Sequence, residues 1–414
     1  MRKSKTVLYL SLFFWLILGI TSLSYSDDAT VLPKGVFSPQ VKGTYFFPHS
    51  KRFDPDGHVE DIAADYNVNL DSSIFTGLAA LDPFVTGPAS IGNTEISMEI
   101  TRTELEFSLA RGVTDKLSVG IRFPYLILKN KVDARLNPGT ANVGKNVALN
   151  TLLPLTVPGT EPLTTDDVQD LIGEGLDING DGAVEVAGYG FKRFDTFSES
   201  GIGDIDVGLK YQYLKTKDWR LAATFGVRFP TGEVDDPDDL ADLSFGDGQY
   251  DLLLRLHQDY TGYKNLVLNG TFRYDLQLPD HEVRRVPNNV NQPITPEDNK
   301  ENVKRDLGDI FEFEVSGTYT FLKVFDVFLL YNYAFKLKDS ISGDKGLAYE
   351  SLENETDQSE QIIKTGLSFS TLPWFMEKTF PYPFRASLEY RNKFAGTNNV
   401  LKSQFISFTL TGFF

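Results

Sequence analysis

The sequence predicts an all-β protein, a closed antiparallel transmembrane β-barrel of about twelve strands. Two observations favour this fold most strongly. Apolar and polar residues alternate with a period of two in many segments. The connections between these segments are, with few exceptions, alternately long and short along the chain. An N-terminal segment typical of exported proteins is the third observation.

The N-terminus carries the features of a secretory signal peptide. Three basic residues within 1–5 precede an apolar run over 6–23, and Ser24-Tyr25-Ser26 places small residues where a signal peptidase reads them. The alternative, an uncleaved membrane anchor, is disfavoured because the run is short and two acidic residues follow at once. We therefore expect a signal peptide over 1–26 and an outer-membrane β-barrel domain over 27–414.

Composition narrows the classes of function. The formal net charge is −17, and it becomes −20 without residues 1–26, which hold three basic and no acidic residues. A nucleic-acid partner is therefore disfavoured, because phosphate backbones need Lys and Arg. The chain has no cysteine, which excludes disulfides and thiolate metal sites. Beyond the signal, no apolar stretch approaches the ~20 residues of a transmembrane helix.

Strict alternation is clearest in the middle of the chain. Mostly polar or small residues separate the apolar side chains of Ile205, Val207, Leu209, Tyr211 and Tyr213, and then those of Trp219, Leu221, Ala223, Phe225, Val227 and Phe229. This period gathers the apolar side chains on one face of a strand. Four polar residues, 215–218, separate the two runs and predict a β-hairpin.

The pattern recurs along the chain. We expect twelve strands, near 35–47, 98–111, 117–131, 203–214, 219–229, 248–259, 266–276, 309–321, 324–338, 359–371, 384–394 and 401–414. Most are long enough to cross a bilayer when tilted. Their number is even, as a single-chain barrel requires when both termini lie on one side.

The lengths of the connections give independent support. Short gaps are expected at 112–116, 215–218, 260–265 and 322–323, with a somewhat longer one at 372–383. Long outer loops are expected at 48–97, 132–202, 230–247, 277–308 and 339–358, and only the last outer connection, 395–400, is short. Transmembrane barrels have tight periplasmic turns and long outer loops, whereas a soluble sandwich has no reason to gather its long loops at one end.

The end of the chain resembles the C-terminal signal that outer-membrane assembly machinery recognises. Counting back in twos from the terminal Phe414 gives Gly412, Leu410, Phe408 and Ile406. Gly412 departs from the aromatic residue often found at its position. The resemblance implies the barrel assembly machinery as a partner.

Short glycine-rich motifs resemble those of a broader family. They are Gly201–Tyr211, Gly226–Glu233 and Phe245–Asp251, together with Leu32–Gly35 and Arg52–Gly57. These motifs are similar to those of outer-membrane proteins of the meta-pathway phenol-degradation type. The resemblance implies a channel for hydrophobic compounds or other small molecules, and it defines no catalytic residues.

Channels for fatty acids and aromatic hydrocarbons are a related comparison. Those channels have a long N-terminal hatch inside the barrel. Here only about eight residues, 27–34, precede the first expected strand. We therefore expect any plug to come from a long loop.

The polar face of the strands points into the lumen if the apolar face meets lipid. The charged residues expected there are Arg122, Arg220, Arg228, Arg255, Arg273, Arg385, Arg391, Glu104, Glu106, Asp204, Asp206, Asp251, Asp275, Glu312, Glu314, Asp326 and Glu389. They either line a water-filled path that selects solutes by charge or form salt bridges that fill and stiffen a narrow barrel.

Two outer loops have unusual compositions. Residues 231–247 include seven acidic and no basic residues, so this loop either attracts cations and bridges lipopolysaccharide through divalent ions or is simply solvated. The first loop is apolar between 74 and 85. Its candidate gate or hydrophobic ligand-site residues in the barrel mouth are Phe75, Leu78, Leu81 and Phe84. Packing against the barrel rim is the alternative.

A third loop resembles the start of a calcium-binding EF-hand loop. Asp177, Asn179 and Asp181 offer oxygens at positions 1, 3 and 5, and Glu185 follows at position 9. Gly188 stands where the twelfth-position Glu would be. A short helix is expected before it over 164–176, capped by Thr164 or Thr165. Calcium is the only cofactor expected, and an Asx-rich turn is the alternative.

The sequence does not indicate an enzyme. It has four histidines, of which only His257 falls on an expected strand, and no G-x-S-x-G, H-E-x-x-H or phosphate-loop motif. We expect an exported outer-membrane barrel, in contact with lipid and lipopolysaccharide, that passes small, hydrophobic or aromatic solutes passively. The alternative is a non-conducting structural or surface-interaction barrel.

Overall fold

The computed structural model describes residues 28–290, 292 and 294–414. The expected signal peptide over 1–26 lies outside these residues. Among the residues described, no helix is long and apolar enough to cross a membrane.

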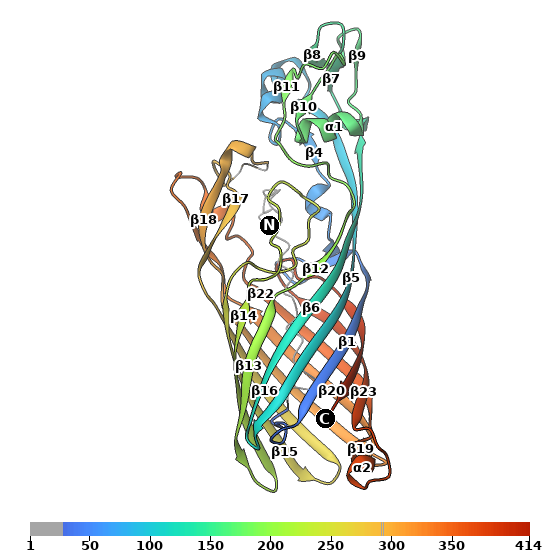
Figure 1. Ribbon diagram of the computed structural model, residues 1–414. Coiled ribbons are helices and arrows are strands. Elements are labelled where there is room, and N and C mark those ends of the chain that lie inside the picture. Colours follow the sequence, from blue (N-terminus) through green and yellow to red (C-terminus); the bar gives the residue numbers. More distant parts are fainter. Residues whose placement is uncertain (1–27, 291, 293) are drawn as a thin grey trace.

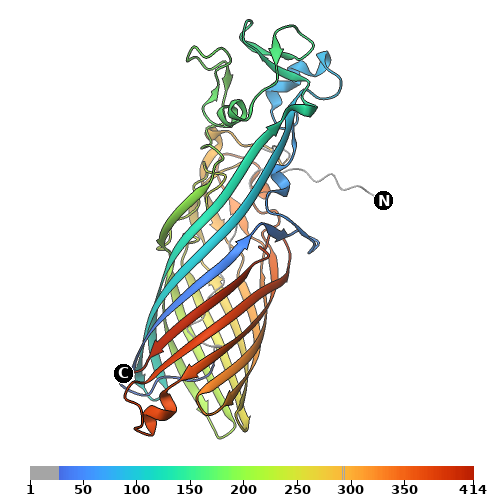
Figure 2. The ribbon, with the colours of Figure 1, turned by 90° about the vertical axis from the view of Figure 1, so that its right-hand side faces the viewer.

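Twelve long strands form one closed sheet (Figures 1 and 2). They are β1 (Phe37–His49), β5 (Ser90–Thr114), β6 (Leu117–Asn137), β13 (Ile205–Lys215), β14 (Trp219–Phe229), β15 (Asp251–Tyr263), β16 (Leu266–Gln277), β19 (Ile310–Phe321), β20 (Phe325–Lys336), β22 (Gln358–Ser370), β23 (Phe384–Gly396) and β24 (Gln404–Gly412). Each pairs antiparallel with its neighbours, and β24 pairs with β1 to close the ring. The predicted antiparallel barrel of twelve strands is confirmed.

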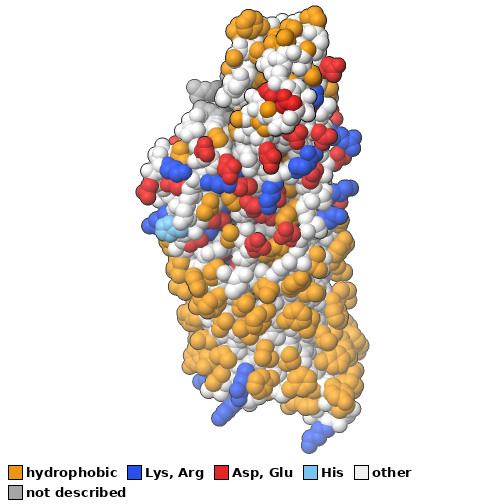
Figure 3. All heavy atoms as spheres, turned by 45° about the horizontal axis from the view of Figure 1, so that its top comes forward, with side chains coloured by type: hydrophobic (Ala, Val, Ile, Leu, Met, Phe, Trp, Pro, Cys, Tyr) orange, Lys and Arg blue, Asp and Glu red, His pale blue; other side chains and the backbone are white. Residues whose placement is uncertain are grey.

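Alternation along each strand separates an apolar outside from a polar inside. In β19, Phe313 and Val315 are exposed, whereas Glu312, Glu314 and Ser316 are buried. Hydrophobic side chains form a continuous surface over the lower part of the molecule (Figure 3). Lipid offers no hydrogen-bond partner to a free strand edge, so a sheet with this exterior must close.

The two ends of the barrel differ, as the loop lengths predict. At the end taken as periplasmic, tight turns join the strands, and the short helix α2 (Leu372–Met376) lies there beside the C-terminus (Figure 2). In the turn between β19 and β20, Leu322 and Lys323 both have positive φ, 51° and 66°. Two successive positive φ values give a tight hairpin turn whose twist matches that of the strands.

The strands β5 and β6 are much longer than predicted. They run past the barrel rim as a two-stranded ribbon (Figure 1). Near the rim the inner face of this ribbon becomes apolar, with Met98, Ile100, Leu126 and Leu128 buried. Folded loops cover this face, so the ribbon continues where the sequence suggested loop.

The outer loops contain short elements of their own. The first holds β2 (Lys51–Phe53), β3 (Val59–Asp61), η1 (Ala64–Tyr66), β4 (Asn69–Asp71) and η2 (Thr76–Phe84). The second holds η3 (Pro138–Thr140), β7 (Val143–Asn146), β8 (Thr151–Pro154), β9 (Thr160–Glu161), α1 (Thr165–Ile172), β10 (Gly175–Leu176), β11 (Val186–Ala187) and β12 (Phe197–Ile202). Later loops hold β17 (Asp280–Arg285), η4 (Glu297–Asn299), β18 (Lys300–Asp306), β21 (Ser340–Ser342) and η5 (Tyr349–Ser351). We call the first two folded loops, with the outer ends of β5 and β6, the outer cap.

Helix α1 begins where the sequence predicts and ends earlier. Thr164 is the N-cap, and its hydroxyl and backbone N–H exchange hydrogen bonds with Asp167 in a capping box. The helix ends at Ile172 and not at Leu176, because Gly173 follows and Gly175 adopts a φ of 121°.

The lipid-facing surface gives a first prediction. Phe313→Lys places a charge on the outer face of β19, and we expect it to lower the free energy of unfolding by about 2–4 kcal/mol if the site lies near the bilayer midplane. Phe313→Leu, which keeps the site apolar, is the control. Guanidinium unfolding in lipid vesicles measures the difference, and equal stability of the two variants would contradict a lipid-facing position.

Candidate functional site

The charged residues predicted for the lumen all lie on the inner face of the barrel. Most are buried, and Arg220, Arg385 and Glu389 are partly exposed. The structure thus brings together groups that are far apart in the sequence.

One cluster of ion pairs spans five neighbouring strands. Arg122 on β6 lies 2.7 Å from Asp206 on β13 and 3.4 Å from Glu106 on β5. Arg228 on β14 lies 3.0 Å from the same Asp206 and 3.2 Å from Asp251 on β15. The carboxylate of Asp206 is therefore shared by two guanidinium groups, which ties the wall together across this side of the barrel.

A second cluster lies on the strands that follow. The guanidinium of Arg273 on β16 lies 3.1 Å from Glu312 and 3.4 Å from Glu314, both on β19. The ammonium of Lys364 on β22 lies 3.8 Å from Glu314, and Asn332 donates to Glu312 at 3.0 Å. Buried charges are costly unless they are paired, and here pairing extends from strand to strand.

Some luminal charges were missed by the sequence analysis. Arg102 pairs with Glu104 at 2.9 Å, and Glu360 lies 2.5 Å from Lys393 and 3.6 Å from Arg391. Arg102 has the same strand phase as Glu104 and so was open to prediction. In β22 the adjacent Ile362 and Ile363 blur the alternation that would have marked Glu360.

The N-terminal segment 28–34 crosses the inside of the barrel at its periplasmic end. The Ala29 N–H donates to both carboxylate oxygens of Asp259 at 3.1 Å, and its carbonyl accepts from the Gln212 amide at 2.6 Å. The ammonium of Lys210 donates to the Asp28 carbonyl, and Ser118 accepts from the Leu32 N–H at 2.9 Å. The expectation that only a long loop reaches the lumen was wrong, because polar wall residues hold even this short segment.

A cavity of about 220 Å³ lies beside this segment. Its lining combines Thr30 and Leu32 of the segment with wall residues such as Ser108, Thr224 and Arg255. The segment therefore narrows a path that would otherwise be wider at this level.

The acidic loop, residues 231–247, folds back onto the inner face of β5 and β6. Its Leu243 and Phe245 are buried against Leu126 and Leu128, and Asn130 donates to the Ala241 carbonyl at 3.0 Å. The sequence suggested a loop facing solvent. The alternating apolar residues 241, 243 and 245 explain why it packs on the apolar ribbon instead.

Basic residues from other loops pair with the carboxylates of the acidic loop. Asp238 lies 2.6 Å from Arg285 of β17 and also contacts Lys300 of β18. Asp235 lies 3.7 Å from Arg284, and Asp236 lies 2.8 Å from Lys192. These basic residues are distant in sequence, so the composition of the loop alone gave no sign of them.

Burial changes the acidity of this loop. Burial raises the pKa of the Asp242 carboxyl to about 6, and the nearby Asp235 carboxylate adds to the shift. Burial also raises the pKa of Asp247 to about 6, together with the charge of Asp204. In an unfolded chain the pKa of an Asp carboxyl is about 3.9. Both carboxyls therefore bind a proton more tightly in the packed loop than in an unfolded chain.

The apolar stretch of the first loop lies in the outer cap. Phe75 and Leu78 are buried in a cluster with Leu171 and Leu176, Leu81 packs against its edge, and Phe84 is 70% exposed. Most of this cluster comes from the two folded outer loops, and Ile91 of β5 and Ile294 of a later loop complete it. A gating role for these four residues stays a prediction.

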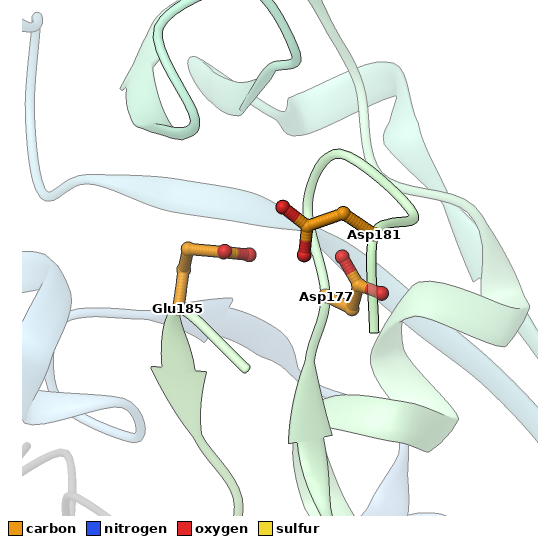
Figure 4. A group of neighbouring side chains, drawn as sticks. All are labelled: Asp177, Asp181 and Glu185. Atoms are coloured by element: carbon orange, nitrogen blue, oxygen red, sulfur yellow. The ribbon is translucent and has the colours of Figure 1, made fainter. Parts of the chain in front are cut away.

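The EF-hand-like residues converge in the loop between β10 and β11 (Figure 4). One carboxylate oxygen from each of Asp177, Asp181 and Glu185 lies within 4.8 Å of the others. The amide of Asn179 donates to Asp181 at 3.0 Å. Backbone N–H groups of Gly182 and Gly180 donate to Asp177 and lower its pKa.

His257, the histidine expected on a strand, is buried inside the barrel. Its Nε2 lies 2.8 Å from the Thr224 hydroxyl, and its Nδ1 lies 3.4 Å from the Thr271 hydroxyl. Both contacts join it to threonines of neighbouring strands.

The shared ion pairs give a second prediction. Arg228→Met leaves Asp206 and Asp251 short of a buried partner, so we expect a loss of about 3–5 kcal/mol in unfolding free energy. The control is Arg135→Met, because Arg135 pairs with Asp133 at 2.9 Å while its side chain is 69% exposed, and it should cost about 1 kcal/mol or less. Similar losses from both variants in guanidinium unfolding would contradict a structural role for the cluster.

The packed acidic loop gives a third prediction, on pH dependence. Because the Asp242 and Asp247 carboxyls have raised pKa values when packed, protonation favours packing, and the loop should loosen as pH rises from about 4 to 6. Hydrogen exchange of 231–247, corrected for intrinsic rates, should show more protection at pH 5 than at pH 7.5. Asp242→Asn should reduce this difference. Equal protection of the unchanged protein at both values would refute it.

Solved structures with a similar fold are outer-membrane proteins. The chain is similar to the COG4313 outer membrane channel from Pseudomonas putida F1, with 10% identity, a TM-score of 0.53 and coverage of 95% of this chain and 100% of that one. A weaker similarity is to the Ralstonia pickettii toluene transporter TbuX, with 10% identity, a TM-score of 0.35 and coverage of 92% of this chain and 90% of that one. No curated protein matches the chain. The first likeness shows an outer-membrane barrel fold.

The family resemblance found in the sequence is confirmed over most of the chain. The match covers residues 134–402, from the outer part of β6 to the turn before β24. The chain belongs to the family described as "Putative MetA-pathway of phenol degradation".

Proposed function

We propose that the protein is a passive outer-membrane channel for small molecules, with hydrophobic or aromatic solutes as the class. The observation that carries this proposal is that two segments outside the paired strands enter the lumen and contact its wall. Residues 28–34 occupy the periplasmic end, and the acidic loop packs on the inner face near the outer end. Both can move while the strand pairing of the barrel stays intact.

The luminal wall supports this proposal by its rigidity. The ion pairs of Arg228 and Arg273 join strand to strand, so the barrel keeps its shape when a luminal segment moves. The wall is also polar, so water can fill the path once it opens.

The class of solute rests on the family and on the outer cap. The family description refers to phenol degradation. The outer cap exposes apolar side chains such as Phe84 to the medium. These features favour hydrophobic or aromatic solutes over ions or sugars.

A non-conducting barrel is the second candidate. The dense ion pairs between Arg122, Asp206 and Arg228 favour it, because such pairs also stiffen a sealed lumen. In that case the outer cap would be the part of the protein that interacts with partners at the cell surface. Conductance decides between the two.

The channel proposal gives a fourth prediction. Removal of residues 28–34 should raise single-channel conductance several-fold, because it clears the periplasmic end without cutting a strand pair. Lys210→Met, which removes only the contact with the Asp28 carbonyl, should give a smaller rise. Planar bilayers and uptake of phenol into liposomes are the measurements. A folded deletion variant that neither conducts nor takes up solute would support the non-conducting barrel.

We also propose that the loop over 177–185 binds calcium. Three carboxylates within 4.8 Å of one another and the amide oxygen of Asn179 supply the hard oxygen ligands that calcium prefers. Gly188 stands at the twelfth loop position, so the bidentate Glu ligand of an EF-hand is lacking there. We therefore expect weak binding that needs about millimolar calcium.

Calcium binding is the fifth prediction. Calcium should raise the thermal midpoint of unfolding, since a ligand that binds only the folded state stabilises it. Asp177→Ala with Asp181→Ala should abolish the rise. An unchanged response in this double variant would place calcium elsewhere.

Two partners are proposed for the barrel surface. The alternating Ile406, Phe408 and Leu410 of β24 face outward, which suits recognition by the assembly machinery before insertion. Lipopolysaccharide would contact the exposed charges above the apolar surface through divalent ions. Crosslinking from the outer face of β24 tests the contact with the assembly machinery, and crosslinking from the exposed charges tests the contact with lipopolysaccharide.

A further inference from the structure

A pocket in the outer cap lies apart from the lumen. Its walls come from the inner face of β5 and β6, from the first loop, from α1 and from the acidic loop. Its apolar lining includes Ile74, Phe75, Ala134, Val168, Ile172 and Phe194. The volume is about 70 Å³, and part of the lining remains exposed, so the pocket opens to solvent.

Three polar side chains of the lining, those of Thr94, Thr165 and Gln169, are already hydrogen-bonded to the backbone. Thr94 accepts from the Val68 N–H at 2.8 Å, and Thr165 accepts from the Leu136 N–H at 3.0 Å. The Gln169 amide accepts from the Phe194 N–H at 2.9 Å and donates to its carbonyl at 3.3 Å. A polar ligand would therefore lose its water without gaining a new partner here.

No charged group of the lining faces the pocket. The lining includes one charged residue, Arg135, whose guanidinium is in solvent and paired with Asp133 at 2.9 Å. Burial keeps the pKa of the Tyr66 phenol well above its usual value, so this wall residue stays neutral. The pocket therefore excludes carboxylates and ammonium groups as buried parts of a ligand.

Apolar side chains in the walls remain partly open to water in the absence of a ligand. Val168 and Ile172 of α1 and Leu136 of β6 are partly exposed although they flank the buried cluster. Covering such surface is favourable by about 25 cal/mol per Å². A cavity of about 150 Å³ with similar walls holds benzene, so this smaller, open pocket suits a single ring with one edge toward solvent.

We propose that this pocket is a binding site for a small uncharged one-ring aromatic molecule, which the outer cap takes up before passage. The role of the site in uptake rests on the proposed channel function. The chemical class of the ligand rests on the lining of the pocket alone. Leu240 of the acidic loop forms part of the wall, so a ligand in the pocket contacts the loop that packs on the inner face of β5 and β6.

Fluorobenzene is the probe, followed by ¹⁹F NMR line broadening with the folded full-length protein in detergent and with matched empty micelles. The unchanged protein should show saturable binding beyond the partition into micelles. Ala134→Phe fills the pocket and should leave only that partition. Ala80→Phe is the control, because it adds the same ring on the exposed side of η2. 4-Fluorobenzoate, which adds a charged carboxylate to the same ring, should show no saturable binding.

A second variant covers the case in which Ala134→Phe does not fold. Val168→Thr keeps the size of the wall and adds a hydroxyl, and it should weaken fluorobenzene binding by about threefold to tenfold. Absence of saturable binding to the unchanged protein, or unaltered binding to both pocket variants, would overturn the proposal.

Conductance of the same samples separates this inference from the channel itself. Saturable binding without conductance would support the ligand site and contradict the channel proposal. Conductance and phenol uptake without saturable fluorobenzene binding would contradict the ligand site and support the channel proposal.

Discussion

Backbone amides in lipid have no partner except another strand, and the rest of this structure depends on that constraint. It requires the sheet to close, as β24 does by pairing with β1. Closure then fixes which side chains face lipid and which face inward. The apolar residues of each strand form the outer surface, and the polar residues are forced together in a confined lumen.

Confinement explains why the luminal charges are paired so extensively. Buried charges are costly unless they are paired, and most of the seventeen charged residues expected on the inner face lie against an opposite charge, in many cases on the next strand. Asp206 illustrates this, since it lies between Arg122 and Arg228. Ion pairs join the wall of this lumen from strand to strand, and residues 28–34 and the acidic loop pack on its inner face.

The outer cap follows from a change of pattern within two strands. The inner face of β6 is polar at Ser118 and Arg122 and apolar at Leu126 and Leu128. Above the barrel an apolar inner face must be covered, and the loops that cover it also build the apolar pocket. The packing of these loops and the candidate ligand site therefore have a common origin in this ribbon.

The sequence by itself determined the barrel, the twelve strands and the side chains that face inward, because a period of two depends only on neighbouring residues. It also placed the start of α1 and the cluster of Asp177, Asp181 and Glu185, which are local patterns. Only the tertiary structure decided what fills the lumen. The contact of Ala29 with Asp259 and that of Asp238 with Arg285 join residues far apart in the chain, and no local pattern encodes such distances. The extent of β5 and β6 was likewise decided by the loops that pack on them.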